Sequence, residues 1–191
     1  MLLRKIGFVN RSLRWLLEID KAVPPRSDKE LSVEVERNYR WNYTANLLDG
    51  AFFWFGNSFA SASTIIPLFV SKLTFNPFAI GLVAIIAQSG WALPQLFTAN
   101  AVEQLPRKKA IVVNVGFFLE RLPTWLWIIA ALISKRSPNL ALVLFLVSFA
   151  WFNLGAGVAA TAWQDLIARC FPVDRRGRFL GTTLFVGAGF G

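Results

Sequence analysis

The most informative pattern in the chain is a set of long apolar runs that contain no charged residue. Asp, Glu, Lys and Arg are absent from residues 50–71, 73–102 and 137–164. Each run exceeds the ~20 apolar residues that cross a hydrocarbon core about 30 Å thick. A helix of a soluble protein would carry polar residues along one face, and a half-buried strand would alternate them with apolar ones. The pattern therefore predicts an all-α integral membrane protein.

About five membrane helices are expected, separated by polar turns and loops, of which the long inner loop over residues 165–178 precedes the fifth helix. They span residues 48–70, 78–102, 110–133, 140–164 and 179–191. The fifth holds only 13 residues, which cover roughly 20 Å at a rise of 1.5 Å per residue. Because a chain terminus inside lipid leaves polar groups without partners, we expect helix 5 to be truncated and the sequence to be a piece of a longer protein.

The first 44 residues are polar, and we expect them to form a cytoplasmic segment ahead of a membrane bundle over residues 45–191. Within residues 1–17, apolar side chains recur three or four positions apart, between basic ones. This spacing is typical of an amphipathic helix in the membrane interface. Pro24 and Pro25 would end that helix, and residues 26–36 would form a charged linker. An organellar transit peptide has the same features and is the alternative interpretation.

The distribution of charge predicts the orientation of the chain. Only 16% of its 191 residues are charged, against 55% hydrophobic, and the formal net charge is +9. Sixteen of the 20 basic residues precede the first helix or follow the second and fourth, whereas three lie in the other loops. This asymmetry is the positive-inside pattern. We therefore expect a multi-pass protein of the plasma (inner) membrane with a cytoplasmic amino terminus, and a lipid rather than a nucleic-acid partner.

The composition also excludes several classes of site. Cys170 is the sole cysteine and the chain has no histidine, so an internal disulfide and the usual zinc or haem sites are excluded. No nucleophile–base arrangement and no phosphate-binding loop occurs in the sequence. We therefore predict no catalytic residue, no metal and no cofactor, and a protein that is not an enzyme.

Polar residues recur within a narrow arc on the first and fourth expected helices, and more weakly on the second. Because polar groups gain nothing from facing lipid, these positions should face protein or water. Close helix packing through small and hydroxylated residues is the alternative to a cavity. The candidate cavity residues are Asn57, Ser61, Thr64, Gln88, Asn153 and Gln164.

Glu120 and Arg121 are the most costly side chains in the expected membrane helices. Glu120 follows Ala110 by ten residues, or ~15 Å, which places it near the middle of the hydrocarbon core. A charge at that depth costs about 2.5–3.5 kcal/mol on insertion scales, so it needs a partner or a function. Uptake and release of a proton by Glu120 is one interpretation, and a buried ion pair is the other. Pro123 should free the carbonyl of Leu119 as an acceptor for a neighbour.

The loop after the second expected helix resembles a known signature. Residues 99–109 read Ala-Asn-Ala-Val-Glu-Gln-Leu-Pro-Arg-Lys-Lys. This is similar to the pattern Gly-x-Leu-Ala-Asp-Arg-x-Gly-Arg-Arg-x of the major facilitator superfamily. The acid is kept as Glu103 and the basic pair as Arg107 and Lys108, whereas Ala99, Gln104 and Pro106 depart from the pattern. Residues 172–178, followed by Gly181, resemble that family's connection between helices 4 and 5.

The resemblance covers about residues 46–191 and implies the first half of a twelve-helix transporter. It implies transport of a small solute across the membrane by alternating access, secondary active, with the second half of the same protein as a partner. In that family, charges of the loop hold the outward-open state, and Arg107 would meet Asp165. The implied cytoplasmic gate consists of Glu103, Arg107, Lys108, Asp165 and Asp49.

Two groups of alternatives remain. Plain solvation at the membrane interface would also account for the charges of the implied gate. For the whole protein, the alternatives are a membrane scaffold or assembly role, and a membrane-embedded enzyme.

Overall fold

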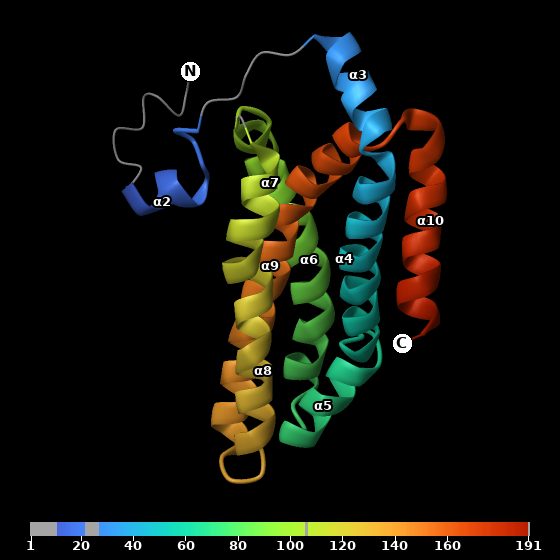
Figure 1. Ribbon diagram of the computed structural model, residues 1–191. Helices are drawn as coiled ribbons and strands as arrows, with labels where there is room; N and C mark the ends of the chain where they lie inside the picture. The colour runs from blue at the N-terminus through green and yellow to red at the C-terminus, as the bar shows by residue number, and fades with distance from the viewer. Residues whose placement is uncertain (1–10, 22–26, 106, 191) are drawn as a thin grey trace.

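The computed structural model describes residues 11–21, 27–105 and 107–190, and Figure 1 shows their long helices lying side by side in a bundle. No strand occurs in these ranges, so the predicted all-α class is confirmed. The elements are α2 (Arg11–Leu16), α3 (Asp28–Arg37), α4 (Tyr39–Phe59), α5 (Ile65–Leu73), α6 (Pro77–Glu103), α7 (Lys108–Ala110), the π-helical turns η1 (Ile111–Val115) and η2 (Phe117–Arg121), α8 (Leu122–Ile133), α9 (Pro138–Cys170) and α10 (Val173–Gly189).

Three helical stretches in the described part of the chain are long and apolar enough to cross a membrane. They are Pro77–Glu103, Lys108–Ile133 and Pro138–Cys170. Each is longer than the ~20 residues that a span requires, and they match the second, third and fourth expected helices. The helices α4 and α10 pack against each other and match the first and fifth. That these two also cross the membrane stays a prediction.

Helix α9 is the centre of the packing. It is 33 residues long and contacts α6, α8 and both π-helical turns. Its buried middle is rich in small residues, from Gly155 to Ala160, which lets neighbouring backbones approach closely. Nearer the end of the bundle that carries α5 (Figure 1), α9 contributes large aromatic side chains instead. The rings of Phe145 and Phe149 stack 5.8 Å apart and belong to an apolar cluster with residues of α5, α6 and α8.

The closest approach to α9 occurs at Gly155. Pro123 has no N–H to offer the carbonyl of Leu119, four residues earlier. That carbonyl oxygen lies against α9, where a Cβ built on Gly155 would be 2.4 Å from it. Such a distance is far inside van der Waals contact, so only glycine fits without a shift of backbone. The Leu119 carbonyl therefore faces a neighbouring helix, and its expected role as an acceptor stays a prediction.

The prediction of one continuous helix over residues 48–70 is wrong. A non-helical break separates α4 from α5, and α4 begins well before residue 48. Pro67 cannot donate to the carbonyl of Ser63, and its ring disfavours a continuous helix there. The hydroxyl of Thr64 donates to Ser61 Oγ at 2.8 Å. Hydroxyl groups that form local hydrogen bonds compete with the backbone hydrogen bonds of a helix. These two effects account for the break between α4 and α5.

Two predictions for the loops are also wrong. The expected linker over residues 26–36 contains α3, whose first turn is closed by a capping box between Ser27 and Glu30. The expected loop over residues 165–178 is mostly helical, because α9 continues to Cys170 and α10 starts at Val173. Of the expected amphipathic helix over residues 1–17, α2 is the described part; residues 1–10 and the pair Pro24–Pro25 lie outside the described residues.

The contact at Gly155 gives a prediction about stability. Gly155→Ala should lower the free energy of unfolding by about 1–3 kcal/mol, because its methyl group would overlap the Leu119 carbonyl. Thermal unfolding of the purified protein in detergent measures this. Gly81→Ala in α6 is the control, since a Cβ there meets nothing within 4 Å, and it should leave the midpoint unchanged or slightly higher. Equal midpoints for the two variants would contradict the packing described here.

Candidate functional site

A charge cluster joins α4 to the π-helical turn η2. Arg121 Nη2 lies 3.3 Å from Asp49 Oδ1, and Arg121 Nη1 lies 3.5 Å from Glu120 Oε2. One guanidinium thus lies between two carboxylates that are 71 positions apart in sequence. The Glu120 side chain is only 14% exposed, whereas those of Arg121 and Asp49 are about half exposed. Single π-helical turns inside α-helices often mark functional positions.

Asp49 belongs to this cluster, whereas the sequence placed it at the cytoplasmic gate. Because α4 begins at Tyr39, Asp49 lies ten residues along the helix, about 15 Å from its start. Glu120 lies at a similar distance, about 18 Å, from the start of its own helical stretch at Lys108. The sequence put Asp49 at the mouth of the helix because the polar residues before position 45 were assigned to the cytoplasmic segment. Its part in a cytoplasmic gate stays a prediction.

A cavity of about 270 Å³ opens beside the charge cluster. Its lining combines the three charged side chains with Asn57, Thr124 and four aromatic rings. The rings are Phe52, Phe53, Trp127 and Phe152. A small hydrophobic chamber with a few charged and polar groups is the usual composition of a small-molecule site.

A larger cavity of about 800 Å³ adjoins it and shares several lining residues, Asn57 among them. Five of the six predicted cavity residues line it, from three different helices and the break between α4 and α5. These residues are Asn57, Ser61, Thr64, Gln88 and Asn153. The polar stripes read from the sequence therefore converge on one space.

Asn153 shows that packing and cavity lining are not exclusive. Its amide Nδ2 donates to the carbonyl of Phe149 at 2.8 Å, within its own helix. Its Cβ lies 2.7 Å from the point where a Cβ on Gly90 would stand, so it also forms the α6–α9 contact. Gln164, the sixth predicted residue, is exposed on α9 and is not part of either cavity lining within the described residues.

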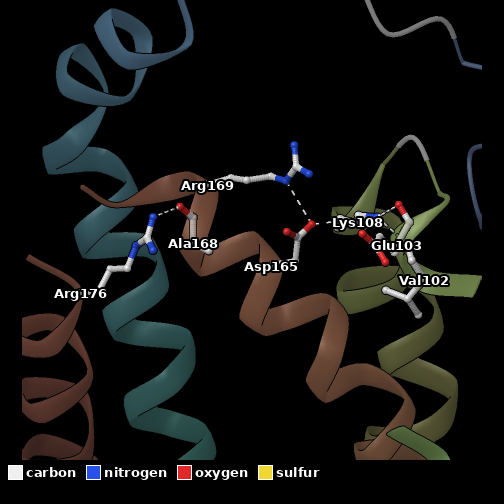
Figure 2. Close-up of polar contacts among 7 residues, drawn as sticks. All are labelled: Val102, Glu103, Lys108, Asp165, Ala168, Arg169 and Arg176. Atoms are coloured by element: carbon white, nitrogen blue, oxygen red, sulfur yellow. Dashed lines mark hydrogen bonds and ion pairs between the residues drawn. The ribbon is translucent and has the colours of Figure 1, made fainter. Parts of the chain in front are cut away.

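At the carboxyl-terminal end of α6, the side chain of the buried Lys108 caps the helix (Figure 2). Lys108 is 7% exposed, and its ammonium donates to the carbonyls of Val102 and Glu103. These carbonyls lie in the last turn of α6, where the partial negative charge of a helix end attracts a cation. The same Nζ lies 4.0 Å from Asp165 Oδ2 on α9. Lys108 therefore connects the end of α6 to α9.

The cations around Asp165 differ from the expected arrangement. Arg169 Nε donates to Asp165 Oδ2 at 3.0 Å, and Lys108 approaches from the loop. Arg107, which was expected to meet Asp165, has its Nη1 3.5 Å from Glu18 Oε2. The next basic residue of the loop thus takes the position predicted for Arg107. Pro106, between the two ends of this loop, lies outside the described residues.

The sequence model of the Major Facilitator Superfamily matches residues 8–191. The chain belongs to the Major Facilitator Superfamily. The match takes in nearly the whole sequence, including most of the amino-terminal segment that the loop resemblance left out. No curated protein and no solved structure matches the chain significantly.

Membership of the superfamily establishes a multi-pass membrane protein and implies transport of small solutes across the membrane. It argues against an enzyme, because the superfamily is one of transporters. The loop signature that suggested this family has its acid and its basic pair at the junction of α6, α7 and α9. Glu103 contributes its backbone carbonyl to Lys108 there.

The sequence did not predict that the amino-terminal segment contacts the region where α6, α7 and α9 meet. Asn114 Nδ2 donates to the carbonyl of Leu16 at 2.9 Å, and Leu17 and Ile19 pack against the apolar cluster at the ends of α6 and α9. The Lys21 ammonium, hydrogen-bonded to the Glu18 carboxylate, holds the pKa of that carboxyl below its usual range. The only sequence signal was the apolar spacing, which fits a protein surface as well as a lipid surface.

The geometry at Lys108 predicts unequal effects of removing the two cations at Asp165. Lys108→Met should lower the free energy of unfolding by about 1–3 kcal/mol, because the carbonyls of Val102 and Glu103 lose their charge-assisted hydrogen bonds from the ammonium. Arg169→Met should cost less than about 1 kcal/mol, since its side chain is 61% exposed and its pair lies at the surface. Thermal unfolding of both variants in detergent compares them, and a larger loss for Arg169→Met would contradict the capping role.

Proposed function

We propose that this protein moves a small solute by alternating access, as a secondary active transporter. The observation that carries the proposal is the 800 Å³ cavity lined by polar residues of α4, α6 and α9. Polar side chains inside a membrane bundle mark substrate or ion pathways, because they gain nothing from contact with lipid. Superfamily membership supplies the class of activity, and the cavity supplies a place for the solute.

The break between α4 and α5 supports the same proposal. Ser61 and Thr64, which belong to the break, both line the large cavity. Irregular backbone at membrane depth is tolerated where it borders protein or a water-filled space. A break at this position exposes backbone and hydroxyl groups to the cavity, where a polar solute can hydrogen-bond to them.

The contact of Lys108 with Asp165 is the proposed cytoplasmic latch. It joins the end of α6 to α9 through a nearly buried ammonium, so opening this end of the bundle would separate a cation from its acceptors. In the proposed cycle, a second bundle of the same protein closes the open side of the cavity, and the latch forms and releases as the two move.

We further propose that the loop between α6 and α7 faces the cytoplasm of a cell whose plasma (inner) membrane holds the protein. The excess of basic residues in the amino-terminal segment, in this loop and around the junction of α9 and α10 supports that orientation. In a Cys170→Ser background, a membrane-impermeant maleimide applied to intact cells should label Asn139→Cys. It should label Gln104→Cys only after permeabilisation. Labelling of Gln104→Cys in intact cells would reverse the orientation.

The transport proposal is tested with the intact protein in proteoliposomes. A panel of labelled sugars, amino acids, organic cations and organic anions is offered under an imposed proton or sodium gradient. At least one solute should accumulate above the level in protein-free vesicles. Asn57→Leu should reduce that accumulation tenfold or more, because Asn57 lines both cavities. Gln164→Leu is the matched control and should transport normally. No accumulation of any solute by folded protein would contradict the proposal.

Glu120→Gln then separates coupling from packing within the same assay. The variant keeps the Arg121–Asp49 pair, so the remaining cluster is electrically neutral and folding should survive. If Glu120 carries the coupling proton, the variant loses proton-driven accumulation but still exchanges solute across the membrane when the solute concentration is saturating. If Glu120 only holds the bundle together, accumulation persists and the loss appears in thermal stability. Unchanged accumulation therefore excludes the coupling role.

A further inference from the structure

The formal charges of the residues that line the cavities do not sum to zero. Among the described lining residues, the charged ones are Asp49, Glu120 and Arg121. Two carboxylates and one guanidinium give a formal charge of −1. Coulomb interactions near a protein surface are stronger than in bulk water, so a cavity with an excess of negative charge attracts a positive occupant and repels an anion.

The aromatic lining narrows the kind of positive occupant. The cavity beside the charge cluster is lined by Phe52, Phe53, Trp127 and Phe152. A third cavity next to it, of about 100 Å³, is lined by Trp54, Trp91 and Trp163 among others. The face of an aromatic ring attracts a cation, and such rings recognise quaternary ammonium groups in particular. An organic cation can also bury its alkyl surface against the same rings.

An inorganic metal ion fits this lining less well. Hard divalent cations are held by several oxygen ligands at once, whereas the two carboxylates of the cavity beside the cluster, Asp49 and Glu120, already face the Arg121 guanidinium. No group of three or more residues suited to holding a metal ion occurs in the described part of the chain. The rings occupy most of the remaining surface.

From the charge balance and the rings together, we propose that the cavity beside Asp49 and Glu120 binds an organic monocation of the quaternary-ammonium class. This proposal rests on the proposed transport function and names its class of substrate. The carboxylates supply the attraction, Arg121 keeps them apart and holds their positions, and the rings enclose the alkylammonium group. Asn57 and Thr124 offer hydrogen bonds to a polar group elsewhere on the solute.

Direct binding tests this proposal without any transport. The intact protein in detergent is titrated calorimetrically with choline and with benzyltrimethylammonium, and with 3,3-dimethylbutan-1-ol, the neutral carbon analogue of choline. At least one cation should bind, and choline should bind at least tenfold more tightly than its neutral analogue. Asp49→Asn and Glu120→Gln should each weaken cation binding tenfold or more, because either change makes the cluster neutral. Asp174→Asn, an exposed acid of α10 outside the cavities, should bind as the parent does.

The outcomes separate this inference from the transport proposal. If neither cation binds, or if choline and its neutral analogue bind equally, the cation site is wrong, and accumulation of another solute in proteoliposomes would leave the transport proposal standing. If the cations bind but no solute accumulates, the site stands and the transport proposal fails. Asp49 is half exposed, so Asp49→Asn should fold even where Glu120→Gln does not, and a folded Asp49→Asn protein with parental affinity would overturn the inference.

Discussion

Close contact between helix backbones along the small-residue stretch of α9 is the constraint on which the rest of this structure depends. Lipid supplies no hydrophobic drive between helices, so packing at short distance has to hold them together. Gly155 receives the carbonyl that Pro123 frees on Leu119, and Gly157 lies against the carbonyls of Gly90 and Trp91. These contacts fix α6 and the π-helical segment on α9, and they therefore fix Glu120 and Arg121, which follow Leu119 directly.

The charge cluster is a consequence of that placement. With the π-helical turn held against α9, Arg121 reaches across to Asp49 on α4, and the two carboxylates share one guanidinium. At the membrane depth that the sequence predicts for Glu120, each charge on its own would be costly. Together they form a site whose remaining charge is a single negative one, surrounded by rings. The polar break between α4 and α5 extends the same space away from the cluster.

At the carboxyl-terminal end of α6, the contacts are those of a capped helix terminus. The last carbonyls of a helix attract a cation, and Lys108 donates to two of them in α6 while it approaches Asp165 on α9. The amino-terminal segment packs onto the same junction through Leu17 and Ile19 and places Glu18 beside Arg107. The proposed latch is therefore built from three separate parts of the chain, and only its central loop carries the superfamily signature.

The sequence by itself determined the all-α membrane class, the positions of the second, third and fourth helices, and the superfamily. Uninterrupted apolar runs and a local loop motif are properties of neighbouring residues, so they can be read without a fold. It also supplied five residues of the large cavity, because helical periodicity places them on one face. The sequence contained the signals for the break ahead of Pro67 and the capping box at Ser27, but the apolar run and the charge pattern outweighed them.

Only the tertiary structure decided which charges meet. Asp49 joins Arg121 because α4 starts at Tyr39 and packs within reach of η2, and neither fact follows from the residues around Asp49. Lys108, and not the adjacent Arg107, reaches Asp165, because the direction of a loop side chain depends on how α6 ends against α9. Ion pairs between distant positions require the relative placement of whole helices, and that placement is set by contacts such as the one at Gly155, which involve residues far apart in the chain.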